Sequence, residues 1–361
     1  MNPHRPSKPV DEFDDTPFKY PSQLPPTSDG KNPNVIIVGA GISGLYLAIL
    51  LDKAGIPYEI YERAKEVKPL GSVMSLNGSI LASMEQVPKE RIHFSKKVLS
   101  MEQNKDGVMI RCADNTTYHG DVLVGADGAY SGVRQSLYKM LERKKVLPPS
   151  DAEDMNKGFN CLVGTTDPMD PVKYPVVARE DSIFSQVIGK GTHYTWAEFN
   201  VPENRICWVV VSQLATLGEA EKTRFRNSTW GSESHADMIN DVKDFRVPGG
   251  GTLGNLIDHT PKENISRVFW EEKLFETWTH GRTVLIGDAA HKLLPSAGQG
   301  AVCAMQDSVI LANCLYDLKS LKYESIVEAL EDFKEQRFEN VKKQFKTSKA
   351  NAIFLHGQVR E

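Results

Sequence analysis

Short apolar runs that end at glycine alternate with a helical pattern near the start of the chain. Residues 35–38 read Val-Ile-Ile-Val and stop at Gly39, which is typical of a buried strand. Apolar positions at helical spacing follow over 43–54 and stop at Gly55, and a second apolar run occupies 58–61. This order predicts a β-α-β unit with two parallel strands and a right-handed crossover.

Between residues 91 and 124 the pattern changes to short runs separated by turn residues. The polar segments 104–107 and 114–115 are typical of hairpin turns, so we expect a β-meander. Val122-Leu123-Val124 then reads as another buried strand and stops at Gly125. The runs expected to form the hairpins are 92/94, 98–101, 108–111 and 116–118.

The middle of the chain has the pattern of antiparallel strands, and the last part that of helices. A polar helix is expected near 232–245, and Val284-Leu285-Ile286 reads as one more buried strand. Amphipathic patterns predict helices over 301–318 and 325–345. The expected antiparallel strands are 159–164, 182–188, 193–199 and 206–212.

Together these patterns predict an α/β protein with a discontinuous nucleotide-binding domain. A Rossmann-like half with a parallel sheet and a β-meander would span 34–150 and 271–320, and a mainly antiparallel domain, 151–270, would be inserted in it. Residues 321–361 would add a C-terminal helix. The first 33 residues hold eight of the 20 prolines, so we expect a disordered tail there.

Composition and charge exclude several classes of function. The net charge of −4 gives no field that would hold nucleic acid. The five cysteines are scattered without a CxxC, and no HxxxH or HExxH occurs, so neither a disulfide scaffold nor a metal site is expected. Residues 35–51 lack charge but are too short for a membrane span and contain three glycines. We expect a cytoplasmic protein, and peripheral membrane contact and oligomeric state stay open.

The candidate chemistry begins with the GxGxxG motif at residues 39–44. Its first glycine permits a tight turn, its second lets a pyrophosphate approach the backbone, and its third lets helix and strand pack closely. The helix N-terminus would present free N–H groups to the phosphates. Glu62 follows the second strand, where a carboxylate can accept both hydroxyls of an adenosine ribose. The motif therefore predicts a dinucleotide site, and the alternative is a tight turn with a surface glutamate.

Two further motifs place an aspartate at the end of a buried strand. Gly125-Ala126-Asp127-Gly128, with Ser131 and Arg134 after it, follows one strand, and Gly287-Asp288-Ala289-Ala290-His291 follows another. Open α/β sheets bind ligands at this edge. Either aspartate alone could be a helix cap, and His291 is expected to be a structural cap.

The three motifs, in this order, resemble the group A FAD-dependent monooxygenases, the class of para-hydroxybenzoate hydroxylase. The stretch GDAAHKLLPSAGQGA at 287–301 is very similar to their flavin-ribityl motif. Within that class the chain most resembles fungal monooxygenases of secondary metabolism, which often epoxidise or hydroxylate terpenoid-like substrates. The resemblance covers roughly residues 34–350.

The resemblance implies FAD as cofactor and NADPH or NADH as electron donor. Glu62 would hold the adenosine ribose, Asp127 would lie near the pyrophosphate and the approach of the nicotinamide, and Asp288 would bind the ribityl chain or the pyrophosphate. Residues 298–301 would lie beside the pyrimidine edge of the flavin, with a helix N-terminus aimed at it. The expected FAD-binding residues are Gly39, Gly41, Ser43, Gly44, Glu62, Arg63, Asp127, Asp288, Gly298, Gln299, Gly300 and Ala301.

The expected reaction transfers one atom of O2 to an apolar small molecule, and the cofactor carries the chemistry. Tyr194 and Trp196 alternate on one face of a predicted strand. Tyr194 is the candidate catalytic residue, as a hydrogen-bond donor to substrate. The alternative for both side chains is ordinary packing of the sheet.

The chain departs from the family in length. Gly39 and Asp127 are only 88 residues apart, whereas family members have several dozen more, and the join falls near residues 86–87. The missing part normally supplies an arginine that contacts the flavin and part of the roof of the site. The usual C-terminal extension is also lacking. The alternatives are a catalytically impaired flavin-binding form, or a flavin or nicotinamide dehydrogenase without oxygen transfer.

Overall fold

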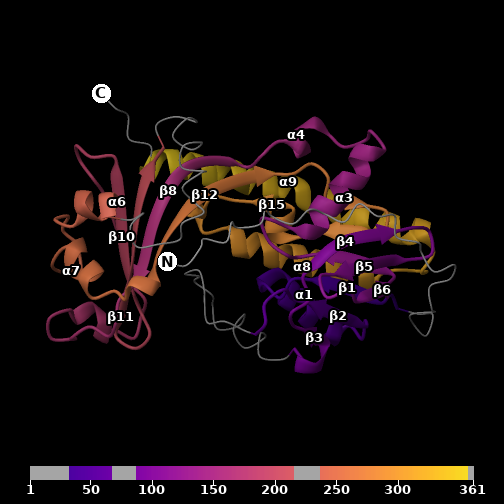
Figure 1. Ribbon diagram of the computed structural model, residues 1–361, viewed down its shortest axis with the longest axis horizontal. Coiled ribbons are helices and arrows are strands. Elements are labelled where there is room, and N and C mark those ends of the chain that lie inside the picture. Colours follow the sequence, from indigo (N-terminus) through magenta and orange to yellow (C-terminus); the bar gives the residue numbers. More distant parts are fainter. Residues whose placement is uncertain (1–31, 67–86, 215–235, 357–361) are drawn as a thin grey trace, which may run out of the picture. The chain divides into compact units, whose positions relative to one another are not determined.

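The computed structural model describes residues 32–66, 87–214 and 236–356, which fall into two compact units (Figure 1). Most of the predicted proline-rich tail and the expected join at 86–87 lie outside or at the border of the described residues. The first unit comprises Met1–Asp154, Leu274–Lys292 and Gly298–Gln344, and the second comprises Met155–Lys273, Leu293–Ala297 and Phe345–Glu361.

A parallel sheet forms the centre of the first unit, as the sequence predicts. Strand β1 (Val35–Val38) lies between β2 (Tyr58–Tyr61) and β7 (Val122–Gly125) and is parallel to both. Strand β14 (Thr283–Leu285) pairs in parallel with β7. All four residues of β1 are buried, which is why an unbroken β-branched run occupies this position. The sheet order is β13-β14-β7-β1-β2-β3, with β13 at Thr279–His280.

One of the expected hairpin strands belongs instead to the parallel sheet. Strand β3 (Ile92–His93) pairs in parallel with β2, and the Arg91 guanidinium donates to the carbonyl oxygen of Tyr58 at 3.0 Å. A run of two residues holds too little pattern to show its partner. The remaining hairpins are confirmed as an antiparallel sheet in the order β4-β5-β6, with bounds Val98–Gln103, Val108–Cys112 and Thr117–Gly120.

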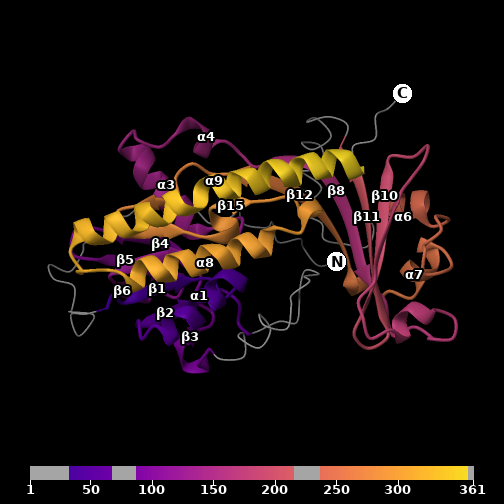
Figure 2. The ribbon, with the colours of Figure 1, turned by 180° about the vertical axis from the view of Figure 1, so that it is seen from behind.

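Four long helices belong wholly or partly to the first unit. Figure 2 shows α8 and α9 side by side, and α1 packs closely against α8. Helix α9 is longer than predicted and passes from the first unit to the second at residue 345. No helix in the described part of the chain is long and apolar enough to cross a membrane. The bounds are α1 Ile42–Lys53, α3 Gly132–Arg143, α8 Gly300–Tyr316 and α9 Tyr323–His356; a single turn, α4, covers Pro149–Ala152.

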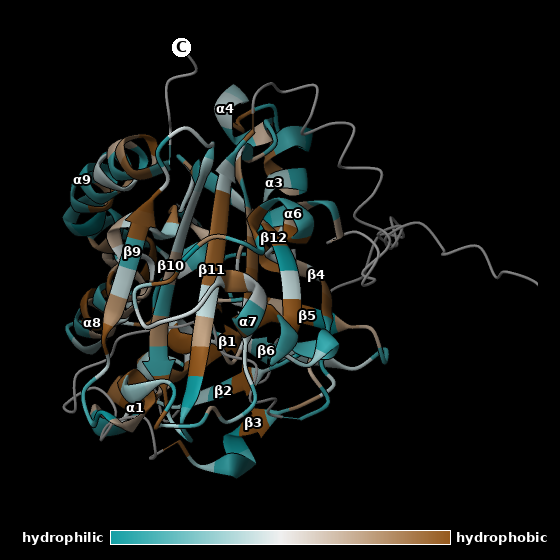
Figure 3. Ribbon diagram, turned by 90° about the vertical axis from the view of Figure 1, so that its left-hand side faces the viewer, coloured by the Kyte–Doolittle hydropathy of each residue, from teal (hydrophilic) through white to brown (hydrophobic). Residues whose placement is uncertain are grey.

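The second unit is built on antiparallel strands (Figure 3). The sequence predicted four of them but missed β12 (Ile265–Leu274), because charged residues interrupt its pattern. Those charges are paired: Lys157 binds Glu271 at 3.1 Å, and Lys349 binds Glu272 at 2.8 Å. The strands follow one another as β12-β8-β11-β10-β9, with β8 at Asn156–Thr165, β9 at Phe184–Ile188, β10 at Tyr194–Val201 and β11 at Arg205–Gln213.

The two faces of this sheet carry different apolar clusters. One face packs with α6 (Ala236–Val242) and α7 (Leu253–Asp258), and its cluster contains the fully buried Trp208. The other face contains a smaller cluster that includes Cys161 and Ala352, a residue of α9. Alternation along each strand sends successive side chains to opposite faces. Of the polar helix predicted over 232–245, only the part from Ala236 onward is described, as α6.

The third glycine of the GxGxxG motif should be essential for folding. A Cβ at Gly44 would lie 2.1 Å from the carbonyl oxygen of Gly39, whereas one at Gly41 would have no neighbour nearer than 4.0 Å. We expect Gly44→Ala to lower the free energy of unfolding by about 1–3 kcal/mol or more, as overpacking does. Gly41→Ala, the matched control, should leave it nearly unchanged. Chemical denaturation of both variants tests this, and equal stabilities would contradict the packing described.

The second unit should lose stability in mild acid because of His356. Its ring is buried between Phe159 and Trp270, and burial lowers its pKa to about 4. The unfolded chain therefore binds a proton below about pH 6.5 that the folded chain does not, so stability falls as the pH drops toward 4. In the wild type this proton should cost up to about 3 kcal/mol of the free energy of unfolding between pH 7 and 4, and His356→Leu should abolish that loss. The free energy of unfolding is measured from pH 7 to 4. The control variant His193→Gln, at an exposed histidine, should keep the pH dependence of the wild type.

Candidate functional site

Three turns leave the same edge of the parallel sheet. They follow β1, β7 and β14, which are neighbours and parallel, so their carboxyl ends meet. The turns are also joined by backbone bonds: the N–H of Ala126 donates to Val38 at 2.8 Å, and that of Ile286 donates to Gly125 at 3.0 Å. The sequence motifs at 39–44, 125–128 and 287–291 therefore lie together, as expected from their positions.

The glycine turn leaves the N-terminus of α1 free for a ligand. Gly39 has a φ of +104°, a conformation that favours glycine. Gly41 is the N-cap of α1, no side chain caps it, and the first turn holds no acidic residue. An uncapped helix N-terminus beside an unobstructed glycine is suited to an anion such as a pyrophosphate.

Glu62 is held against this turn by two backbone bonds. One carboxylate oxygen accepts from the N–H of Ala40 and the other from the N–H of Ala64, both at 2.8 Å. Each oxygen keeps capacity for a further donor. The carboxylate is thus fixed in orientation, and it can still accept hydroxyl groups.

A cavity of about 560 Å³ lies over the first two turns. Its volume is within the range of small-molecule and cofactor sites. Five of the predicted residues line it, namely Gly39, Gly41, Glu62, Arg63 and Asp127. The remaining predicted residues of this unit are not part of its lining; among them Ser43 and Gly44 are buried in α1.

Asp127 brings a buried acceptor to this cavity. One carboxylate oxygen accepts from the N–H groups of Gly132 and Val133 at 2.7 and 3.2 Å, at the start of α3. The other oxygen, Oδ1, is buried and has no hydrogen-bond partner among the described residues. Burial raises the pKa of this carboxyl above its ordinary value. A buried acceptor without a donor is costly, so Asp127 is suited to meet a ligand donor.

Asp288 carries its own counterion. It accepts from the Nζ of Lys292 at 2.5 Å, and each side chain is about one third exposed. The preceding Gly287 has a φ of +58°, which permits the turn. Lys292 was not predicted as a site residue; its spacing of four from Asp288 is the signal that could have identified it.

The four residues 298–301 lead into helix α8 and form its first residues. Gly298 has a φ of +63°, α8 starts at Gly300, and Gln299 provides no side-chain cap. The first turn contains no acidic residue. The predicted helix N-terminus is thus present, and its N–H groups and dipole favour a negatively charged partner.

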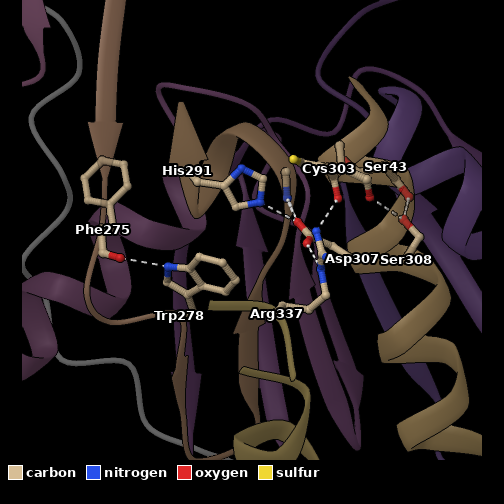
Figure 4. Close-up of polar contacts among 10 residues, drawn as sticks. Ser43, Phe275, Trp278, His291, Cys303, Asp307, Ser308 and Arg337 are labelled. Atoms are coloured by element: carbon tan, nitrogen blue, oxygen red, sulfur yellow. Dashed lines mark hydrogen bonds and ion pairs between the residues drawn. The ribbon is translucent and has the colours of Figure 1, made fainter. Parts of the chain in front are cut away.

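A buried network behind the 287–291 turn was only partly foreseen (Figure 4). His291 contacts Asp307 of α8 at 2.6 Å, and Asp307 also pairs with Arg337 of α9 at 2.8 Å. His291 was expected as a structural cap; Asp307 and Arg337 were not singled out. Asp307 lies four residues from both Cys303 and Leu311 on a buried helix face, and a carboxylate there requires a partner.

The candidate catalytic residue Tyr194 lies in the core of the second unit. Its hydroxyl donates to Asp241 at 2.8 Å, and its pKa is raised mainly by burial. The indole N–H of Trp196 donates to the carbonyl oxygen of Arg246 at 2.8 Å, and both rings pack near Phe245. These contacts favour the packing interpretation over a substrate-facing one.

Comparison with protein families finds two cofactor-binding domains. Residues 37–67 match the NAD(P)-binding Rossmann-like domain, and residues 254–345 match the FAD binding domain. The first match contains the glycine turn and Glu62. The second contains the 287–301 stretch, Asp307 and Arg337.

Curated relatives are fungal monooxygenases. The FAD-dependent monooxygenase ptmM of Penicillium ochrochloron is 26% identical, over 88% of this chain and 87% of its own. The FAD-dependent monooxygenase penM of Penicillium crustosum is 27% identical, over 88% of this chain and 77% of its own. The alignment with ptmM has 384 positions, but 88% of 361 residues is about 318, so about 66 of its residues have no counterpart here.

Two solved structures with the same fold are complexes with FAD. CtdE in complex with FAD superposes with a TM-score of 0.68 at 15% identity, covering 91% of this chain and 96% of that one. HpxO of Klebsiella pneumoniae, complexed with FAD and uric acid, superposes with a TM-score of 0.66 at 19% identity. The superposition covers 90% of this chain and 89% of that one. These likenesses support the mixed α/β fold class predicted from the sequence.

Proposed function

We propose that this chain, which is similar to FAD-dependent monooxygenases over most of its length, hydroxylates or epoxidises an apolar small molecule. NADPH or NADH would supply two electrons, and O2 would supply the atom transferred, with water as the other product. Bound FAD supplies the redox chemistry. The observation that carries the proposal is the cavity lined by the glycine turn, Glu62 and Asp127.

The residues of this cavity fit the adenosine and pyrophosphate end of FAD. Gly41 leaves open space beside the uncapped N-terminus of α1, where a pyrophosphate would be stabilised. The fixed carboxylate of Glu62 would accept the ribose hydroxyls, with Arg63 beside it. The unpaired oxygen of Asp127 offers an acceptor on the same cavity. Ser43 and Gly44 contribute by packing α1 rather than by lining the cavity.

The flavin end of the cofactor would bind at the third turn and at α8. Asp288, balanced by Lys292, would accept from ribityl hydroxyls. The N-terminus of α8, with Gly298, Gln299, Gly300 and Ala301, would stabilise negative charge on the pyrimidine edge of the ring. The carboxylate of Asp288 would be sufficient to bind the ribityl chain, and the N–H groups at the start of α8 would be sufficient to stabilise the ring.

We place the substrate on the sheet face opposite Tyr194 and Trp196. Their face is filled by its own core, whereas the opposite face carries half-buried apolar side chains around Phe159 and Cys161. These are Val163, Val209, Val268 and Trp270. An apolar face suits a terpenoid-type substrate better than a charged one.

The shortness of the chain supports a second candidate, a flavin-binding form with impaired turnover. About 66 residues of a relative have no counterpart in this chain. We expect the loss to fall before Asp127, where the resemblance to the family implies part of the active-site roof. A site that admits water loses control of reactive oxygen chemistry. This candidate has the same FAD site as the first. It differs in that the electrons of NAD(P)H would end in hydrogen peroxide rather than in oxygenated product.

FAD binding tests the shared part of both candidates. We expect the purified chain to bind FAD, seen as flavin bands in its absorption spectrum. Glu62→Ala should weaken binding about tenfold or more, since it removes charge-assisted bonds worth about 1.5–3 kcal/mol. The exposed Glu66→Ala is the matched control and should bind normally. Gly41→Ala, which leaves the fold intact, should also bind weakly; normal FAD affinity in both site variants would overturn the assignment.

The fate of the electrons separates the two candidates. In NAD(P)H oxidation with a terpenoid or aromatic substrate, a chain with an incomplete roof should form hydrogen peroxide and little oxygenated product. Peroxide, product and NAD(P)H consumed are measured together. Product that matches NAD(P)H would establish the monooxygenase and show the lost segment to be dispensable. Consumption without either peroxide or product would contradict both candidates.

A further inference from the structure

Asp307 joins the 287–291 turn to two helices from inside the first unit (Figure 4). Its Oδ2 accepts from the N–H of Gly287 at 2.9 Å and from Nε2 of His291 at 2.6 Å. Its Oδ1 accepts from Nε of Arg337 at 2.8 Å. The carboxylate thus receives donors from both ends of the turn that carries Asp288, and from helix α9.

The three side chains of the network are buried. Asp307 has no exposed surface, and His291 and Arg337 are 1% and 4% exposed. Burial alone would raise the pKa of Asp307, but the charge and hydrogen bonds of His291 and Arg337 outweigh it and lower that pKa. Removing one member of such a group strands the remaining charge, which is strongly destabilising.

The neighbouring residue, Ser308, holds the glycine turn in the same way. Its hydroxyl donates to the carbonyl oxygen of Ser43 at 2.9 Å, and a Cβ on Gly287 would lie 3.0 Å from the Ser43 hydroxyl. Two consecutive residues of α8 therefore contact two of the three motif segments. Residue 307 binds the 287–291 turn, and residue 308 binds α1.

From these contacts we infer that Asp307 is a positioning residue, which fixes the 287–291 turn so that Asp288 and the N-terminus of α8 are held ready for FAD. Asp307 does not itself touch the cofactor in this scheme. The effect on FAD affinity rests on the proposed function, whereas the order of the turn does not.

The test separates order of the turn from stability of the fold. In Asp307→Leu with Arg337→Leu the carboxylate and the guanidinium are removed together, so the guanidinium is not left buried without its partner. We expect the double variant to be more stable to heat than Asp307→Leu alone, in which Arg337 stays buried without its partner. In protein without FAD, however, the amides of 287–292 should exchange with solvent at least about tenfold faster. FAD affinity should fall at least about tenfold.

Two further variants keep the test decisive. Arg337→Met alone leaves both bonds from Asp307 to the turn, so it should lower stability without speeding exchange at 287–292. Ser308→Ala is the matched control on the same helix and should leave that exchange unchanged. Wild-type exchange at 287–292 in the double variant, or parallel changes in stability and exchange in Arg337→Met, would overturn the inference. Failure of the wild-type chain to bind FAD would overturn the proposed function alone.

Discussion

Parallel pairing of β1 with its neighbours is the constraint on which the candidate site depends. It brings the ends of β1, β7 and β14 to one edge, although the last of these lies far along the chain. Buried β-branched residues supply the energy of this arrangement, and glycines supply the turns that leave it. The two carboxylates of the candidate site therefore lie close to the ends of the strands: Glu62 directly follows β2, and Asp127 lies two residues beyond β7.

Polar contacts between the turns give this edge a defined shape. Arg134 illustrates the principle, because its guanidinium donates to Ala289 at 2.9 Å and to Ala129 at 2.6 Å while it lies over the ring of Phe275. A residue of one motif thereby binds the backbone of another. Such contacts are stronger in a buried setting than in water, because the local dielectric constant is low.

Local signals were sufficient for most of the fold and for the cavity, but not for contacts between distant residues. A run such as Val35–Val38 is enough to predict a buried strand, and the glycine motif that follows it is enough to predict a dinucleotide site. Strand β12 was missed because its charges are paired with Lys157 and Lys349, which lie far away in sequence. Arg337 was missed for the same reason. For Tyr194, alternation defines two faces but does not tell which of them α6 and α7 cover.

The order of strands along the chain also bears on synthesis in the cell. Strand β7 leaves the ribosome about 160 residues before β14, its partner in the sheet. At about 5–20 residues per second the delay is roughly 8–32 s. The second unit likewise waits for its segment Phe345–Glu361, which follows the rest of that unit in the chain. Throughout that interval an apolar strand edge stays unpaired, which is a hazard for association between nascent chains. Expression at lower temperature or with chaperones addresses this stage rather than the stability of the finished protein.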